Sequence, residues 1–306
     1  MKNLPKIIIV LGSTASGKTD LGLALAKKFD GEIVSADSRQ VYKKMDIGTA
    51  KPHGAWRKIC GAESFAVEGV PHYMMDIVAP KENFSLADYK ERAIAVINSI
   101  LGRGKLPIIV GGTGLYIWAL VENLDIPKAA PNQELRKRFE KKSKAELVAL
   151  LKKVDPESAK RIDLKNPRRV LRALEVFTFT GESFYKQRTK SKPLFNALQI
   201  GINMPKAELY KRIETRVDRQ IADGLIEETK KLAEKYPWTL PSMSGIGYRQ
   251  VGCYLRGEVT KDEAVEMLKK DTRNYAKRQT TWFKRDQRIN WVSDPAEAEK
   301  LVRRFL

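Results

Sequence analysis

Short apolar runs alternate with amphipathic stretches over the first third of the chain. Ile7–Leu11, Glu32–Ala36 and Leu106–Val110 each predict a buried strand. A helical pattern from about residue 18 to 29 follows the first strand, and Ser85–Gly102 predicts another helix, because its Ser and the Asp three residues later form a capping pair. Strands that are apolar throughout and separated by helices are typical of a parallel sheet covered on both faces.

The pattern changes between about Asn123 and Phe195, where strand-like runs disappear and charged helical segments take over. Ser143–Glu146 is a capping box, and Asp155 followed by proline predicts a helix start. Asn166 and its following proline open a further helix that is expected to end near Gly181. We interpret residues 123–195 as a smaller all-helical insertion domain.

The pattern of the core returns after the insertion. Ala197–Asn203 predicts a strand, and a long helix is expected from Lys206 to about Tyr236. Thr260 caps a last long helix that reaches about Asp286, and Ile289–Val292 predicts a closing strand. The expected fold is therefore α/β, with a parallel sheet flanked by helices in residues 1–122 and 196–306 and the insertion between them.

Charge is the unusual feature of the composition. The 306 residues include 57 Lys and Arg against 37 Asp and Glu, a net charge of +20. This excess favours a polyanionic partner, either nucleic acid or an anionic membrane surface, although a merely lysine-rich protein is the alternative. Cys60 and Cys253 form no metal-binding pattern, and no apolar run is long enough to cross a bilayer. We expect a cytoplasmic protein without membrane segments.

A glycine-rich loop carries the clearest chemical signal. Gly12–Thr19 reads GSTASGKT, which matches the phosphate-binding pattern GxxxxGK(S/T) between a predicted strand and a predicted helix. Its glycines allow successive N–H groups to face phosphate oxygens, and the helix N-terminus adds its positive dipole end. Lys18 supplies a charge, and the Thr19 hydroxyl suits a magnesium ion. The loop alone does not decide between phosphoryl transfer, hydrolysis and departure of a diphosphate, and a small-molecule kinase leads on this motif.

Two further segments follow predicted strands and are expected at the same edge of the sheet. Asp37 follows the second strand, where a carboxylate could assist a metal or accept a proton, or simply cap a turn. Asp76 is a competing acid without a polar cluster after it. Gly111–Tyr116, which reads GGTGLY, permits close approach of the backbone to a ligand, although a plain turn is an equal alternative. His53 and His72 lie outside these motifs, which makes a histidine base improbable.

The helix before Asp286 is basic and aromatic. Glu266–Arg288 combines many Lys and Arg with Tyr275, Trp282 and Phe283. Binding to an RNA backbone explains this combination, and a solvated amphipathic helix with core aromatics is the alternative.

Taken together, the motifs resemble the bacterial tRNA dimethylallyltransferases. The resemblance rests on Gly12–Thr19 and on segments that read DSRQVY, MDIGTAKP, GGTGLY, NPRRVLRALE, GIGYRQ and TRNYAKRQ, with Trp282 and Phe283 after the last. It covers nearly the whole chain in the family's order. Ser13 stands where this family usually has proline, at a position that shapes the loop and carries no chemistry.

The resemblance implies prenyl transfer from dimethylallyl diphosphate to N6 of the adenosine immediately 3′ of the anticodon in tRNA. The phosphate loop would then hold a diphosphate leaving group through Gly12, Ser13, Thr14, Ala15, Ser16, Gly17, Lys18 and Thr19, with Mg²⁺ on Thr19. By the same resemblance, Asp37 is the catalytic base that takes the amino proton, and Thr113 and Arg216 assist the diphosphate. Arg212 and Arg219 share a helix with Arg216 and compete for that role.

The resemblance also implies contacts with the anticodon stem-loop of tRNA, whose target base must be extruded from its loop to reach the site. The implied contacts are Asp37, Ser38, Arg39, Gln40, Asn166, Arg168, Arg169, Arg172, Gly245, Gly247, Tyr248, Arg249, Gln250, Arg273, Lys277, Arg278 and Gln279. We expect a monomer. The rival readings are a P-loop kinase of a small metabolite and an RNA-binding protein whose phosphate loop has no catalytic role.

Overall fold

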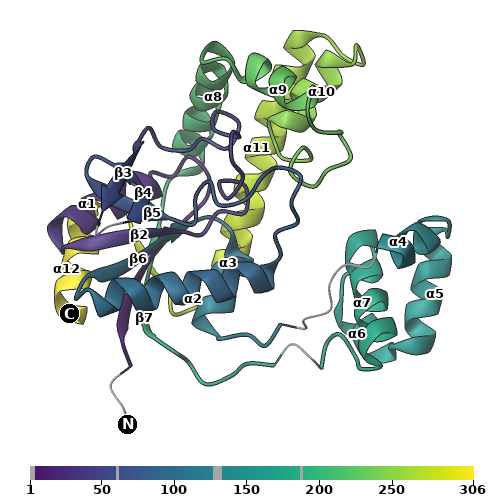
Figure 1. Ribbon diagram of the computed structural model, residues 1–306, viewed down its shortest axis with the longest axis horizontal. Helices are drawn as coiled ribbons and strands as arrows, with labels where there is room; N and C mark the ends of the chain where they lie inside the picture. Colours follow the sequence, from purple (N-terminus) through teal and green to yellow (C-terminus); the bar gives the residue numbers. More distant parts are fainter. Residues whose placement is uncertain (1–3, 60–61, 127–132, 187–188) are drawn as a thin grey trace. The chain divides into compact units, whose positions relative to one another are not determined.

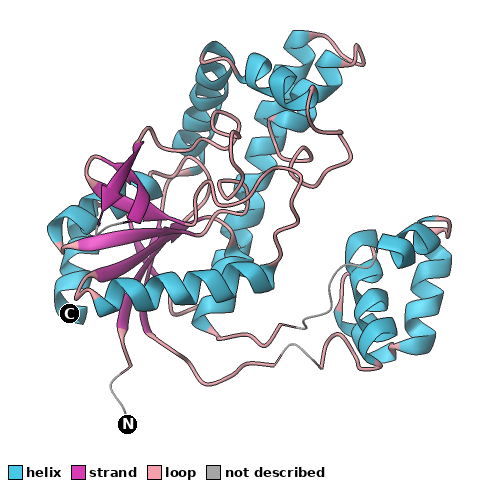
Figure 2. Ribbon diagram, in the orientation of Figure 1, coloured by secondary structure: helices cyan, strands magenta, loops and turns pink. Residues whose placement is uncertain are grey.

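The computed structural model describes residues 4–59, 62–126, 133–186 and 189–306. The chain divides into two compact units, one made of Met1–Trp118 and Leu194–Leu306 and the other of Ala119–Pro193. The first unit holds the sheet and the second is built from helices (Figures 1 and 2).

A single eight-stranded sheet forms the centre of the first unit, in the order β3-β4-β5-β2-β6-β1-β7-β8. β1 lies between β6 and β7 and is parallel to both. The carboxyl ends of β1, β2 and β6 therefore share one edge, from which the loops carrying Gly12, Asp37 and Thr113 emerge. The strands are β1 (Lys6–Leu11), β2 (Gly31–Ser35), β3 (Ala55–Ile59), β4 (Ala62–Val67), β5 (Val70–Tyr73), β6 (Leu106–Gly111), β7 (Asn196–Ile202) and β8 (Asn290–Val292).

The predicted parallel sheet is confirmed for the central strands, but one edge is antiparallel. β4 pairs antiparallel with β3 and with β5, while β5 joins the rest of the sheet by running parallel to β2. None of these three strands was predicted. β3 is exposed over most of its length and β5 has four residues, so neither produces a long apolar run.

Helices cover both faces of the sheet. α1 (Lys18–Lys28) and α12 (Pro295–Phe305) pack on the face to which Ile8, Val10 and Ile108 point. Because side chains alternate along a strand, Ile7 and Ile9 point to the opposite face. α2 (Leu86–Gly102) packs against β2 and β6, and α3 (Gly114–Val121) follows β6. The apolar strands are thus buried from both sides, as their sequence pattern requires.

A helical group from the C-terminal part packs around the loops at the carboxyl edge (Figure 1). It consists of α8 (Lys206–Ala222), α9 (Leu225–Ala233), α10 (Tyr248–Leu255) and α11 (Lys261–Phe283). The predicted helix from Lys206 to Tyr236 is wrong in one respect, because Gly224 adopts a φ of 99° and separates α8 from α9. Thr260 caps α11 as predicted, through a hydrogen bond from the Glu263 N–H.

The second unit has its own small core. α4 (Gln133–Glu140), α5 (Lys144–Val154), α6 (Pro156–Arg161) and α7 (Pro167–Thr180) pack around Leu147, Leu151, Val170 and Leu174. The capping box at Ser143 and the caps at Asp155 and Asn166 form as predicted. Within the described residues, no helix of either unit is long and apolar enough to span a bilayer.

Candidate active site

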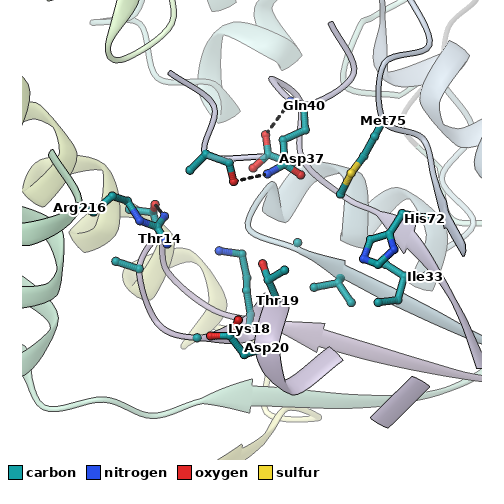
Figure 3. A pocket seen from close by; sticks show the side chains of 15 residues that line it. Thr14, Lys18, Thr19, Asp20, Ile33, Asp37, Gln40, His72, Met75 and Arg216 are labelled. Carbon is teal, nitrogen blue, oxygen red and sulfur yellow. Dashed lines mark hydrogen bonds between the residues drawn. The ribbon is translucent and has the colours of Figure 1, made fainter. Parts of the chain in front are cut away.

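The glycine-rich loop Gly12–Thr19 forms one wall of a cavity at the carboxyl edge of the sheet. Figure 3 shows Thr14 and Arg216 at one end of this cavity, Lys18 and Thr19 in the middle, and Ile33, His72 and Met75 at the other end. Asp37 and Gln40 face the middle from the loop after β2. The lining residues are Thr14, Ala15, Gly17, Lys18, Thr19, Asp20, Ile33, Asp37, Gln40, Ala50, His72, Met75, Val110, Gly111 and Arg216.

The backbone of the loop is held in an unusual conformation. Gly17 has a φ of 88°, and Ala15 has a φ of 63°, a region that costs a residue with a Cβ atom about 1–2 kcal/mol. Ala15 is buried against Leu209 and Ile213 of α8 and Ala276 of α11. Packing by these two helices therefore stabilises a curled loop that local preference disfavours.

The loop carries a positive charge on Lys18 and a hydroxyl donor on Ser16 that lacks a partner among the described residues. Lys18 Nζ donates to Ser13 O over 3.2 Å. The pKa of Lys18 is lowered to about 8, mainly by burial, with Asp37 opposing the shift and Arg216 adding to it. The buried hydroxyl of Ser16 has no hydrogen-bond partner among the described residues. A buried ammonium and an unpartnered hydroxyl beside curled backbone amides are the groups that a bound phosphate would satisfy.

Arg216 is the arginine of α8 that lines the cavity. Its Nη1 donates to Thr14 Oγ1 over 3.2 Å, and burial lowers its pKa although Asp20 and Asp37 raise it. Arg212 pairs with Glu208 at 2.8 Å and Arg219 with Asp223 at 3.4 Å, both on exposed parts of the helix. The geometry therefore favours Arg216 over its two neighbours for a contact with an anion in the cavity.

Asp37 is held with one carboxylate oxygen engaged and the other available. Oδ1 accepts from the Arg39 N–H at 2.8 Å and the Gln40 N–H at 3.4 Å. Oδ2 accepts no hydrogen bond from any described residue. Thr113 does not line the cavity, and its hydroxyl accepts from the Ser38 N–H at 3.0 Å. The structure thus places Thr113 behind the loop that carries Asp37, whereas its predicted contact with a diphosphate stays a prediction.

The competing acid, Asp76, lies in a structural ion pair. Lys51 contacts Asp76 and also pairs with Asp46 at 2.7 Å, and the Lys51 side chain is almost fully buried. An acid that neutralises a buried lysine is not available as a base. Asp37 is therefore the better candidate for proton transfer.

His72, which lies outside the sequence motifs, lines the far end of the cavity beside Ile33 and Met75. Its Nδ1 lies 2.9 Å from Val70 O, so Nδ1 carries the proton and Nε2 is an acceptor. Burial lowers the pKa of His72, which makes the ring neutral at pH 7, and Nε2 has no partner among the described residues. The sequence held no signal for this position because β5, on which His72 lies, was not predicted.

Known proteins resemble this chain over nearly its whole length. A model of the IPP transferase family matches residues 40–286, and one of the isopentenyl transferase family matches residues 5–61. The tRNA dimethylallyltransferase of Acetivibrio thermocellus is 44% identical over 298 residues, with 95% of this chain and 92% of the relative covered. That of Roseiflexus castenholzii is 46% identical over 303 residues, covering 97% and 95%. The chain belongs to the tRNA dimethylallyltransferase family.

Solved structures agree with this assignment. The crystal structure of the tRNA Δ(2)-isopentenylpyrophosphate transferase from Staphylococcus epidermidis matches with a TM-score of 0.69 and 37% identity over 99% of this chain and 100% of that one. A eukaryotic dimethylallyltransferase acting on tRNA matches with a TM-score of 0.75 and 27% identity over 95% of this chain and 75% of that one. The resemblance in sequence is confirmed, and the chain is a prenyltransferase whose substrate is tRNA.

The residues expected to contact tRNA fall into two groups in this family member. Arg168, Arg169, Lys277 and Arg278 are exposed and available to an RNA backbone, whereas Arg249, although exposed, pairs with Asp271 at 2.6 Å. Arg172 pairs with Glu175 at 3.5 Å and Arg273 with Glu214 at 2.7 Å, each partly buried. Asn166 caps α7 by accepting from the Arg168 N–H at 3.1 Å. Ser38 and Arg39 flank the cavity next to Asp37.

The second group is buried. Tyr248 is 1% exposed and donates to Glu228 at 2.7 Å, and Gln250 is fully buried with its amide donating to Asp271 at 2.6 Å. Gly245 and Gly247 are likewise buried at the start of α10. Gln279 is 6% exposed. In the chain without RNA, Tyr248, Gln250 and Gln279 are engaged in packing, and their predicted contact with tRNA stays a prediction. Gln40 is also engaged, donating to Thr49 O and Ala50 O at 3.3 Å.

Proposed function

We propose that this chain transfers a dimethylallyl group from dimethylallyl diphosphate to N6 of the adenosine immediately 3′ of the anticodon in tRNA. The observation that carries the proposal is one cavity lined by both the Lys18 loop and Asp37, whose Oδ2 is free to accept a proton. An anion site and a base facing the same space are what this substitution requires.

The loop end of the cavity suits a diphosphate leaving group. As the C1–O bond of the allylic donor breaks, negative charge develops on the diphosphate. Lys18, Arg216 and the amides of the loop can stabilise that charge, and the unpartnered Ser16 hydroxyl can donate to it. An allylic carbon tolerates positive charge, so neutralising the departing group lowers the barrier.

Asp37 supplies the proton acceptor. The lone pair of the adenine amino group is delocalised into the ring, which makes the nitrogen a poor nucleophile. As N6 bonds to C1, its proton passes to Asp37 Oδ2, while the bonds that Oδ1 accepts from Arg39 and Gln40 keep the carboxylate oriented. The products are N6-isopentenyladenosine, diphosphate and a proton.

The wall of the cavity that the glycine-rich loop forms would suit a magnesium ion. Thr19 and Asp20 both line it, and Mg²⁺ is usually held by one or two protein oxygens together with substrate phosphates and water. Among the described residues, no cluster of three or more His, Cys, Asp or Glu forms a separate metal site. Bound at Thr19, the ion would add positive charge beside the leaving diphosphate.

The far end of the cavity suits the five-carbon tail. Ile33 and Met75 supply apolar surface there, opposite the Arg216 end, and Val110 also lines the cavity. Burying a five-carbon group against such walls favours binding through the hydrophobic effect. The tail and the diphosphate thus occupy opposite ends, with C1 near Lys18 and Asp37.

We further propose that tRNA binds through exposed basic side chains and inserts an extruded adenosine toward Asp37. Arg168 and Arg169 in the helical unit and Lys277 and Arg278 on α11 are the candidate backbone contacts. We propose that the enzyme acts as a monomer. Because the acceptor is tRNA, we place the enzyme in the cytoplasm.

Two parallel incubations separate this function from its rivals. In the first, the protein is mixed with unmodified tRNA, Mg²⁺ and dimethylallyl diphosphate labelled in the tail, and label in tRNA is counted after nuclease digestion. We expect label on the adenosine 3′ of the anticodon. The second replaces the donor with ATP labelled in the γ-phosphate and adds a mixture of small metabolites, and label transferred to a metabolite would indicate a kinase. Binding of tRNA without label from either donor would indicate an RNA-binding protein.

A further inference from the structure

Helix α11 contacts both glycine loops of the site through one buried side chain. Gln279 Oε1 accepts from the Thr14 N–H at 2.8 Å, and Gln279 Nε2 donates to Gly112 O at 2.8 Å. A Cβ atom on Gly112 would lie 2.3 Å from that Nε2, so only glycine allows this approach. The Gln279 amide therefore bridges the phosphate loop after β1 and the glycine loop after β6.

The bridge stabilises the part of the phosphate loop whose backbone conformation is locally disfavoured. Thr14 immediately precedes Ala15, whose φ of 63° is disfavoured for a residue with a side chain. Gln279 of α11 holds the Thr14 amide, and Arg216 of α8 holds the Thr14 hydroxyl at 3.2 Å. Ala15 packs against Ala276 of α11 and against Leu209 and Ile213 of α8. A disfavoured backbone persists only where its surroundings enforce it.

Gln279 lies on the face of α11 opposite to the exposed basic residues. Ala276 and Gln279 are buried, whereas Lys277 and Arg278 between them are exposed. The loop-facing and solvent-facing roles of this helix are therefore carried by different side chains. Gln279 cannot reach an RNA backbone without breaking both of its hydrogen bonds.

We propose that Gln279 is a positioning residue that fastens the phosphate loop in the form that binds diphosphate. The inference rests on the proposed use of the loop for a diphosphate. It replaces the expectation that Gln279 contacts tRNA. Because Gln279 holds the loop and touches neither substrate, its removal should weaken binding of the anion and leave RNA affinity unchanged.

The test compares Gln279→Met, which has similar length and no hydrogen-bonding groups, with Lys277→Ala on the opposite face. Inorganic pyrophosphate with Mg²⁺ is titrated calorimetrically into each protein, and binding of an anticodon stem-loop RNA is measured at several salt concentrations. Loss of two buried hydrogen bonds corresponds to about 5- to 100-fold weaker pyrophosphate binding for Gln279→Met. We expect its RNA affinity and salt dependence to match wild type, and Lys277→Ala to show the reverse pattern.

Several outcomes decide the matter. Wild-type affinity for pyrophosphate in a folded Gln279→Met protein overturns the inference, and so does a weakened, less salt-dependent RNA interaction. If the wild-type protein itself does not bind pyrophosphate, the result contradicts the proposed function of the loop, on which the role of Gln279 rests. Hydrogen exchange provides a measurement on the unmutated protein: the Thr14 amide should exchange slowly without ligand, and rapid exchange contradicts the bridge.

Discussion

Lys18 should make donor binding depend on pH in a range where ordinary lysines stay protonated. Its pKa is lowered to about 8 mainly by burial, whereas an ordinary lysine titrates near about 10.4. An anion in the cavity stabilises the protonated amine, so binding raises the pKa of Lys18 and the protein takes up protons. Affinity is therefore full below pH 8 and falls as the pH rises above it.

The magnitude follows from the protonated fraction. With a pKa of about 8, roughly nine-tenths of Lys18 is charged at pH 7 and about one-tenth at pH 9. If the charged form alone binds, the apparent Kd rises about 10-fold over this interval, and about half a proton is taken up per ligand at pH 8. A phosphate ester loses its last proton near pH 6, so the charge of dimethylallyl diphosphate changes little between pH 7.5 and 9.

The assay is calorimetric titration with dimethylallyl diphosphate and without tRNA, so that no transfer occurs. Proton uptake is measured by repeating the titration in buffers of different ionisation enthalpy. Lys18→Arg is the matched control, because a guanidinium stays charged throughout this range and its Kd should be flat. A wild-type Kd that is constant from pH 7.5 to 9, with no proton uptake at pH 8, would refute the reasoning.

Three further predictions concern the tail, the RNA and the scaffold. Met75→Ala should weaken dimethylallyl diphosphate about 10-fold by removing apolar surface, with pyrophosphate inhibition unchanged; equal losses for both ligands would place the tail elsewhere. Lys277→Ala with Arg278→Ala should lower the log–log salt slope of tRNA binding by about 2, whereas Lys300→Ala with Arg304→Ala, equally exposed on α12, should leave it unchanged. Glu228 accepts from the N–H groups of Asp46, Ile47 and Gly48 and from Tyr248, so Glu228→Ala should cost about 3 kcal/mol and lower Tm by roughly 6–10 °C. Exposed Glu227→Ala should stay within about 0.5 kcal/mol, and equal Tm values for both variants would contradict the structural role of Glu228.

The elements with strong local signals could be predicted from the sequence. The apolar runs of β1, β2, β6 and β7 locate the parallel centre of the sheet, and side-chain caps at Ser85, Ser143 and Thr260 locate helix starts. β3, β4 and β5 could not be predicted, because β3 is mostly exposed, β4 mixes polar and apolar residues, and β5 has only four residues. The break at Gly224 was not predicted, because the apolar spacing of its neighbours indicated one continuous helix.

The candidate site was predictable where function requires a local motif. Gly12–Thr19 and Asp37 meet in one cavity as expected, because both follow parallel strands at one edge of the sheet. Contacts with partners far away along the chain had no signal in the sequence. Gln279 lies in a basic segment, but its partners are 265 and 167 residues away, and only the fold turns it toward them. His72 lines the cavity from β5, a strand that the sequence pattern did not predict.

The central claim is that Asp37 takes the amino proton while the Lys18 loop holds the leaving diphosphate. Its most direct test is the single-turnover rate of prenyl transfer by Asp37→Asn, whose side-chain oxygen can still accept from the Arg39 and Gln40 N–H groups and so keep the loop in place. The account predicts a rate about 10²- to 10⁴-fold below wild type, with unchanged Kd values for dimethylallyl diphosphate and for tRNA. A transfer rate within a few-fold of wild type would contradict it.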